Sequence, residues 1–275
     1  MNRDIANEIE SAVVPDRAIA VWALGQCGFV LKSASCTVGI DLYLSDSVYE
    51  KYGAPWSRTA PPPIAPEALP PLDAVLCTHH HEDHMDEATL RALRTKAATT
   101  FVAPRAHLPL MRDFGLDERR LAGMNHGETL QLPGVEIKAF AAMHDTFEQD
   151  EAGNHRFLGY TLRFDGGYTV YHAGDTIGFP ELPEWIRPER VDAAFVPING
   201  RDYRRTAANI VGNMNYREAA DLAADIDAGV VVPMHYGIFR HNDENPAYFV
   251  DYVYQTYPAL PFRLPRLGER FILWK

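Results

Sequence analysis

The stretch Thr78-His79-His80-His81-Glu82-Asp83-His84-Met85-Asp86 directly follows a short apolar run at 74–77. That run is typical of a buried strand entered from a proline-rich segment. Residues two apart on an extended segment point the same way, so His79 and His81 can bind one ion together. The turn that follows lets Asp83 and His84 face a second ion. Three imidazoles and a carboxylate suit zinc, manganese or iron, so the stretch predicts a metal site rather than a solvated histidine-rich loop.

Length and composition set the broad class. We predict a single domain over residues 1–275, a length that also permits two smaller domains. Hydrophobic residues make up 47% and charged residues 23%, which is ordinary for a soluble globular protein. The net charge of −11 opposes nucleic-acid binding, which needs a basic surface. An anionic substrate is still permitted, because bound cations and a few arginines can reverse the local sign.

The cysteines and the N-terminus indicate the compartment. Cys27, Cys36 and Cys77 lie in apolar strand-like stretches without zinc-knuckle spacing, so they are expected to be buried free thiols in a reducing environment. Residues 1–17 are charged and lack the apolar core of a signal peptide. The longest apolar run, 19–31, is interrupted and too short to span a bilayer. These features predict a cytoplasmic protein with no membrane segment.

Hydrophobic patterning predicts consecutive strands followed by strand–helix units. The expected strands are 19–24, 29–32, 37–40, 74–77, 100–103, 135–142, 156–164, 168–171, 191–198, 230–234 and 271–274. The expected helices are 87–96, 105–114, 215–227 and 248–257, with a helix or arm up to residue 14. Asn215 and Glu218 form a box-like helix start, and Asp165-Gly166-Gly167 indicates a hairpin. Early consecutive strands argue against a Rossmann fold, and the order suggests two similar layered halves.

Residues 45–72 contain seven prolines and are predicted to form a loop. A loop of this length is uncommon in a compact domain and is often functional. It leads directly into the histidine-rich stretch. It is therefore expected either to wall one side of the site or to be a surface excursion stiffened by proline.

Candidate ligands follow four of the predicted strands: His79, His144, Asp175 and His235. One histidine after a strand is more often a structural residue held by hydrogen bonds. Four such positions, on strands that a sheet would bring together, predict one composite site.

In this order, His79-x-His81-x-Asp83-His84, His144, Asp175 and His235 resemble the metallo-β-lactamase superfamily. The resemblance implies an α/β fold, a four-layer αββα sandwich with a dinuclear site in a cleft at its edge. It implies that the first metal is held by His79, His81 and His144, and the second by Asp83, His84 and His235, with Asp175 bridging. The cofactors would be two divalent ions, Zn²⁺ or Mn²⁺, with Fe also compatible. Residues 22–29, 41–46, 174–176, 197–202, 209–215 and 233–236 make the chain most similar to the group that includes ascorbate-6-phosphate lactonase.

This ligand set implies hydrolysis. Two cations roughly 3.5–4 Å apart can share a water and lower its pKa towards neutrality. One of them then stabilises the oxyanion that forms on a carbonyl or phosphorus. Asp83 is the predicted catalytic residue, which orients the nucleophile or carries its proton. Thr78, Asp86 and Asp41 are candidates to orient the imidazoles, with a helix or turn cap as the alternative role of Asp41.

Arg201, Arg204 and Arg205 form a positive cluster near a predicted ligand-bearing edge. Arginine binds phosphates and carboxylates bidentately, so the cluster is a candidate clamp for an anionic substrate. A solvated face or an inter-subunit salt bridge is the alternative. Asn199 and Tyr236 are candidate hydrogen-bond donors to substrate. The other histidines, with His172 and His241 as the main exceptions, are expected to be structural or exposed: His80, His107, His126 and His155.

The sequence therefore predicts a metal-dependent hydrolase of a small anionic lactone or ester, such as a sugar-acid lactone phosphate. Its alternatives are a phosphodiesterase of the same fold, an iron-dependent redox enzyme and a non-catalytic binding module. The net charge and the lack of a basic arm oppose a nuclease. His81 stands where the flavin-linked diiron members have a glutamate, which disfavours the redox alternative. The resemblance modestly favours a homo-oligomer.

Overall fold

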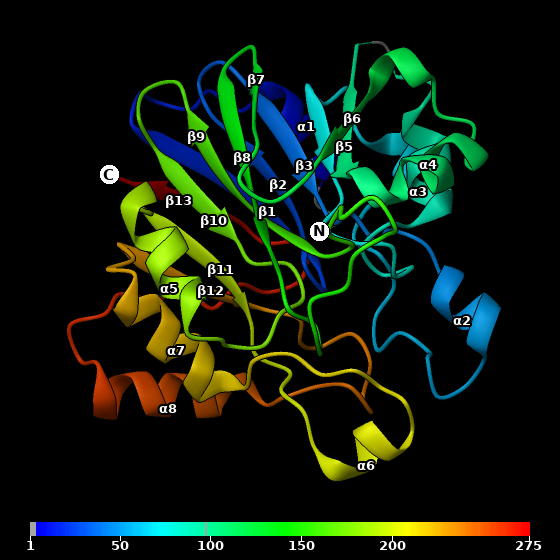
Figure 1. Cartoon of the computed structure of the whole chain (residues 1–275). Coiled ribbons are helices and arrows are strands. Elements are labelled where there is room, and N and C mark those ends of the chain that lie inside the picture. Colours follow the sequence, from blue (N-terminus) through cyan, green and yellow to red (C-terminus); the bar gives the residue numbers. More distant parts are fainter. Residues whose placement is uncertain (1–3, 97) are drawn as a thin grey trace.

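The computed structural model describes residues 4–96 and 98–275, and within them two β-sheets stack face to face (Figure 1). The strands of the first sheet are β1 (Ala18–Gly25), β2 (Gly28–Lys32), β3 (Thr37–Ile40), β4 (Ala74–Leu76), β5 (Thr100–Pro104), β6 (Leu121–Met124) and β13 (Arg270–Trp274). Those of the second are β7 (Thr129–Leu132), β8 (Val135–Ala141), β9 (Leu158–Phe164), β10 (Thr169–His172), β11 (Ala193–Pro197) and β12 (Val230–Met234). Their spatial orders are β13-β1-β2-β3-β4-β5-β6 and β12-β11-β10-β9-β8-β7.

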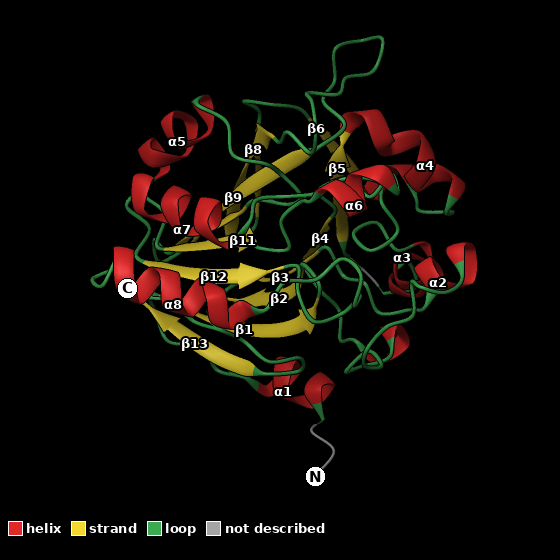
Figure 2. Ribbon diagram, turned by 90° about the horizontal axis from the view of Figure 1, so that it is seen from below, coloured by secondary structure: helices red, strands yellow, loops and turns green. Residues whose placement is uncertain are grey.

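Helices cover the outer faces of both sheets. The first sheet carries α1 (Ile5–Ser11), α3 (Glu87–Leu93) and α4 (Leu108–Asp113), whose apolar side chains share one core with it. Beside the second sheet lie α5 (Glu181–Ile186), α7 (Tyr216–Asp225) and α8 (Pro246–Thr256), with α7 and α8 packed together (Figure 2). The helices α2 (Ser47–Tyr52) and α6 (Tyr203–Ala207) stand apart from these layers (Figure 1). The predicted four-layer αββα sandwich is confirmed.

The sequence of the strand β1 is an unbroken apolar run because both faces of the strand are buried. Ile19, Val21 and Ala23 face the core between the two sheets. Ala20 and Trp22, on the opposite face, pack against the core that includes α1. Side chains alternate across a strand, so a strand buried on both faces needs apolar residues at every position.

Parallel pairing brings several strand ends to one edge of the sandwich. The strands β10, β11 and β12 are parallel neighbours, and so are β3, β4, β5 and β6. Parallel strands finish on the same side of a sheet, so the residues after β4, β10 and β12 are delivered to a common region. Ligands in open α/β sheets typically bind beyond such carboxyl ends.

Most predicted elements are present and differ only at their ends, and the capping box of Asn215 and Glu218 at α7 is confirmed. The prediction of a loop over 45–72 was wrong for Ser47–Tyr52, which forms α2. The elements β6, β7, α5 and α6 were not predicted. β7 is a half-exposed edge strand, α5 contains Pro183, and α6 is a short polar helix, so these three have weak hydrophobic signals.

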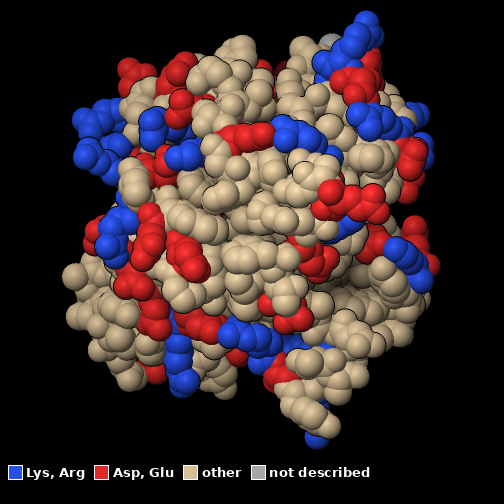
Figure 3. Space-filling model, in the orientation of Figure 1, with Lys and Arg blue, Asp and Glu red and all other residues tan. Residues whose placement is uncertain are grey.

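On the face seen in Figure 3, basic and acidic side chains are interspersed. In the part of the chain that the structure describes, no helix has both the length and the apolar character needed to cross a membrane.

Candidate metal centre

The first half of the centre is built from the ends of β4 and β8. Nε2 of His79 lies 3.0 Å from Nδ1 of His81. The ligand atoms of these two residues, His144 and Asp175 all lie within 4.8 Å of one another. Ring nitrogens that face each other so closely can share a cation through their lone pairs. The structure therefore brings together the three histidines predicted for the first metal.

The second half lies on the other side of Asp175. Nε2 of His84 is 3.3 Å from Oδ1 of Asp175, and Nε2 of His235 is 3.2 Å from Oδ2. Oδ2 of Asp83 lies 3.7 Å from Nε2 of His84 and 3.9 Å from Nε2 of His235. Asp175 thus faces both halves, as a bridging carboxylate must.

Asp41, a fully buried carboxylate after β3, holds the histidine-rich stretch in place. It accepts hydrogen bonds from the backbone N–H and the hydroxyl of Thr78, at 2.8 and 2.7 Å. It also accepts one from Nδ1 of His84 at 2.8 Å, which aims Nε2 of that ring at Asp175. The predicted orienting role of Asp41 is confirmed. Asp86 orients no imidazole; it accepts from the hydroxyls of Ser45 and Thr89.

In the first half of the centre, burial and neighbouring charges favour the forms that bind a cation. Burial lowers the pKa of His79 well below its usual value and that of His144 to about 4, so both rings are neutral. Burial opposes ionisation of Asp175, but the imidazoles of His235 and His84 hold its pKa well below the usual range. Metals bind neutral imidazoles and ionised carboxylates, so His79, His144 and Asp175 are in the forms that bind one.

His84 supplies the clearest test of fit. Its Nε2 is buried and has no hydrogen-bond partner among the described residues. Burial alone would lower the pKa of this ring, but the carboxylates of Asp175, Asp83 and Asp41 raise it well above the usual value. The same balance raises the pKa of His235, through Asp175 and Asp83. A buried nitrogen aimed at carboxylates fits a divalent cation, and the nitrogen and oxygen donors suit zinc, manganese or iron.

The turn between β1 and β2 contributes two residues that the sequence analysis did not place in the site. Nε2 of Gln26 donates to Oδ2 of Asp83 at 2.7 Å and lies 3.4 Å from Nε2 of His235. Cys27, expected to be only a buried free thiol, has its Sγ 3.8 Å from Oδ1 of Asp175. Their position directly after a strand, like that of the predicted ligands, was the available signal.

A cavity of about 320 Å³ opens over the centre. His81, Asp83, His144, Asp175 and His235 form its floor. Val48, Tyr52 and Trp56 form one wall, so the 45–72 segment does border the site, and residues 208–211 form another. The predicted wall role of the proline-rich segment is confirmed for Val48, Tyr52 and Trp56.

The arginine cluster lies beside this cavity rather than in it. Arg201 forms an ion pair with Glu218 at 2.6 Å and lines a neighbouring cavity of about 260 Å³ together with His144. Arg205 pairs with Asp202 and donates to the carbonyl of Asn199, while Arg204 is exposed. Arg201 and Arg205 therefore stabilise the loop after β11, and the substrate-binding role of the cluster stays a prediction.

Asn199 is fully buried and holds the loop through other side-chain amides. Its Nδ2 donates to Oδ1 of Asn242, and its Oδ1 accepts from Nδ2 of Asn213, both at 3.0 Å. It is therefore one residue removed from the cavity, which Asn242 lines. These contacts leave Asn199 a positioning role in the described structure.

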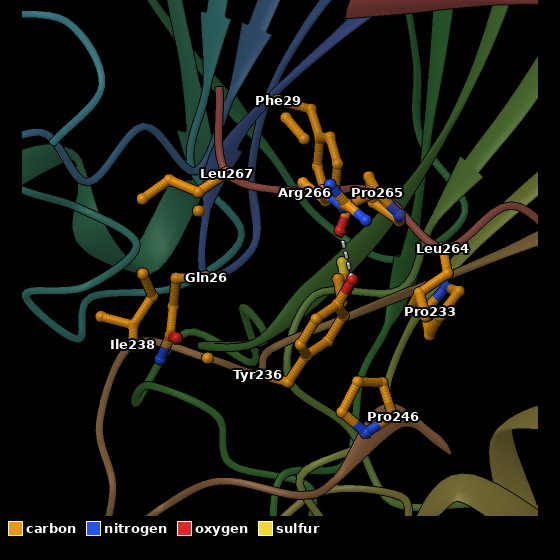
Figure 4. Close-up of a pocket in the computed structure, with 14 residues that line it drawn as sticks. Gln26, Phe29, Pro233, Tyr236, Ile238, Pro246, Leu264, Pro265, Arg266 and Leu267 are labelled. Atoms are coloured by element: carbon orange, nitrogen blue, oxygen red, sulfur yellow. Dashed lines mark hydrogen bonds between the residues drawn. The ribbon is translucent and has the colours of Figure 1, made fainter. Parts of the chain in front are cut away.

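Tyr236 points into a separate apolar cavity of about 460 Å³ (Figure 4). Its hydroxyl donates to the carbonyl of Pro265 at 2.6 Å. Tyr236 does not line the cavity over the metal centre, so the expected contact with a substrate there is not supported. Gln26 lines this apolar cavity as well, while its amide reaches Asp83 on the other side.

The two exceptional histidines both lie near the site. Nε2 of His172 donates to the carbonyl of Cys27 at 2.9 Å and so fixes the turn between β1 and β2. The ring of His241 packs edge-on against Trp56, with 4.1 Å between centroids. Each supports a wall or a turn of the site and does not belong to the predicted ligand set.

Gly174 marks a close approach between the two sheets. It has φ +62°, and a Cβ there would lie 2.8 Å from Cβ of Thr78. We expect Gly174→Ala to lower the free energy of unfolding by about 2–5 kcal/mol, because the left-handed backbone and the overpacking both cost energy. Urea denaturation measures this. Gly127→Ala is the control, since Gly127 also has positive φ but nothing within 4 Å of the added methyl. Equal losses in the two variants would contradict the packing argument.

Residues 43–236 match the family model described as the beta-lactamase superfamily domain. A metal-dependent hydrolase of Myxococcus xanthus is 30% identical over 240 residues, which cover 85% of this chain and 76% of the relative. A probable L-ascorbate-6-phosphate lactonase of Escherichia fergusonii is 26% identical over 273 residues, which cover 87% of this chain and 75% of the relative. The solved structure of a metallo hydrolase from Ignicoccus hospitalis shares the fold, with a TM-score of 0.69, 23% identity and coverage of 94% and 99%.

The family match spans most of the chain, and it includes the histidine-rich stretch, His144, Asp175 and His235. These are the residues that converge at the edge of the two sheets. The chain therefore belongs to the metallo-β-lactamase superfamily, among its metal-dependent hydrolases.

Proposed function

We propose that the protein hydrolyses a small anionic lactone or ester with two divalent metal ions. The observation that carries the proposal is the pair of donor groups sharing Asp175 at the floor of a cavity of about 320 Å³. That volume suits a small molecule. The similarity to a probable L-ascorbate-6-phosphate lactonase supports a lactone as the substrate class.

The residues of the centre and of the cavity walls would have different roles in such a reaction. Divalent ions in this donor set would polarise the scissile carbonyl and lower the pKa of a water. Oδ2 of Asp83 is fixed by the amide of Gln26, and Oδ1 is left to accept a proton from the attacking water. Tyr52 and Trp56 on one wall and residues 208–211 on the other exclude solvent and orient the substrate.

The test is turnover by metal-loaded protein. Protein reconstituted with Zn²⁺ or Mn²⁺ is assayed on a panel of neutral and phosphorylated lactones, carboxylic esters and phosphodiesters. We expect lactone or ester hydrolysis that chelation abolishes and metal restores, and that His81→Ala lacks because its metal is lost. Turnover of phosphodiesters alone would favour the alternative activity. Hydrolysis unaffected by chelation would overturn the proposal.

Arg201 is the arginine through which an anionic group is expected to bind. It lines the cavity next to the metal centre, which His144 also lines. A charge-assisted hydrogen bond contributes about 1.5–3 kcal/mol, so Arg201→Ala should raise KM for a phosphorylated lactone roughly tenfold or more. KM for a neutral lactone should change little. Arg217→Ala, which removes an exposed arginine on α7, is the control. An equal effect on both substrates would show that Arg201 acts only through the loop it holds.

A further inference from the structure

We propose that Cys27 is a ligand of the second metal position. That position would then hold one thiolate, two imidazoles and one carboxylate, from Cys27, His84, His235 and Asp175. The inference rests on the proposed metal-dependent function and adds a sulfur donor to it. It also assigns separate tasks to Cys27 and Asp83, both of which lie close to the same imidazoles.

The distances between these donor atoms approach those between the ligands of one ion. Around zinc, with bonds of about 2.3 Å to sulfur and 2.0 Å to nitrogen or oxygen, neighbouring ligand atoms lie roughly 3.3–3.5 Å apart. Sγ of Cys27 lies 3.8 Å from Oδ1 of Asp175, and Nε2 of His84 lies 3.3 Å from the same oxygen. The four donor atoms, including that of His235, all lie within 4.8 Å of one another.

An independent observation also points to an ion at this place. Nε2 of His84 is buried, has no hydrogen-bond partner among the described residues, and is aimed at the same carboxylate oxygen as the thiol. Nδ1 of that ring is already committed to Asp41. The ring therefore cannot turn to satisfy Nε2 without losing a buried hydrogen bond.

The turn that carries Cys27 is held rigidly. The carbonyl of Gln26 accepts a hydrogen bond from the backbone N–H of His235 at 3.0 Å. The carbonyl of Cys27 accepts one from Nε2 of His172 at 2.9 Å. The backbone that carries the thiol is thus held by His172 in β10 and by His235 after β12. Such support of a donor from behind is what metal sites require.

Asp83 is placed for a different task. Its side chain is 17% exposed and lines the cavity, whereas Cys27 is 0% exposed. Its Oδ2 already accepts a hydrogen bond from Gln26. Cys27 therefore approaches the position from its buried side. Asp83, whose Oδ2 lies 3.7 Å from Nε2 of His84 and 3.9 Å from Nε2 of His235, approaches it from the cavity, where Oδ1 can accept a proton.

A sulfur donor changes which metals the position selects. Thiolate favours zinc and cobalt over manganese and magnesium, and binding releases the thiol proton to solvent. We expect the second position to take zinc or cobalt in preference to manganese. In Cys27→Ala, the zinc affinity of that position should fall by at least the roughly 10–100-fold that follows loss of an outer-shell partner.

Cobalt substitution tests the inference by absorption spectroscopy. The wild-type protein loaded with Co²⁺ should show a near-ultraviolet sulfur-to-cobalt charge-transfer band. Cys27→Ala and Cys27→Ser should lose this band and keep the visible d–d bands of cobalt in the first half. Cys36→Ala, which removes a buried thiol away from the site, should keep both. The serine variant preserves the size of the side chain, which guards against failure of the alanine variant to fold.

Three results separate the possible failures. Bound cobalt without a charge-transfer band in the wild type would overturn the role of Cys27 and leave the metal-dependent function intact. A band that persists in both Cys27 variants would also overturn it. Failure of the folded wild type to bind cobalt or zinc at all would instead refute the proposed function.

Discussion

Asp175→Asn is expected to remove most of the bound metal and nearly all hydrolytic activity while the protein stays folded. Asp175 is the carboxylate that both halves of the centre share. The amide keeps the shape of the side chain but removes its negative charge and one acceptor oxygen. Activity should therefore fall by more than the roughly 10–100-fold that loss of an outer-shell partner causes.

Elemental analysis after gel filtration gives the metal content, and circular dichroism checks the fold. Asp165→Asn is the matched control. Asp165 is exposed in the hairpin between β9 and β10, and asparagine suits a turn before glycine. Full metal content in Asp175→Asn, together with normal activity, would remove this residue from the centre.

Asp41→Ala is expected to be the most destabilising change in the neighbourhood of the centre. The variant leaves the backbone and hydroxyl of Thr78 and Nδ1 of His84 without their buried acceptor. Loss of one partner from a buried charged network costs about 3–5 kcal/mol. The freed ring of His84 should also weaken metal binding by roughly 10–100-fold.

Urea denaturation of the metal-free protein isolates the structural part of this effect, and a zinc titration gives the rest. Asp73→Ala is the comparison, because Asp73 is exposed and accepts one hydrogen bond from the backbone of Thr37 at the start of the same strand. Similar losses in the two variants would show that the buried network around Asp41 contributes little.

The predicted ligands could be found from the sequence because each one follows a recognisable strand. His79, Asp175 and His235 follow apolar strands in parallel ladders, whose carboxyl ends lie at the same edge of a sheet. His144 follows the apolar strand β8, which runs antiparallel to β9. The capping box at Asn215 could be predicted because it depends only on two residues that are three positions apart.

The features that were missed depend on pairing between distant segments. Cys27 meets Asp175 across 148 positions of the chain, and Gln26 meets Asp83 across 57. Gln26 and Cys27 follow a strand, as the predicted ligands do, but the sequence does not show which carboxylate each of them meets. The ion pairs of the arginine cluster could not be predicted for a similar reason, because the partner of Arg201 is Glu218, on a helix that follows the loop. The sequence shows where positive charge is concentrated but not which carboxylates it meets in the fold.

The walls of the cavity have a consequence for how this scaffold can diversify. The described wall segments, 48–56 and 208–211, carry none of the seven predicted ligands. Selection can therefore alter Trp56 or Val211 without replacing any of the metal-binding side chains. The same metal centre can in this way come to act on new substrates during evolution. A directed-evolution library confined to these two segments would sample such changes while the metal-binding residues stay the same.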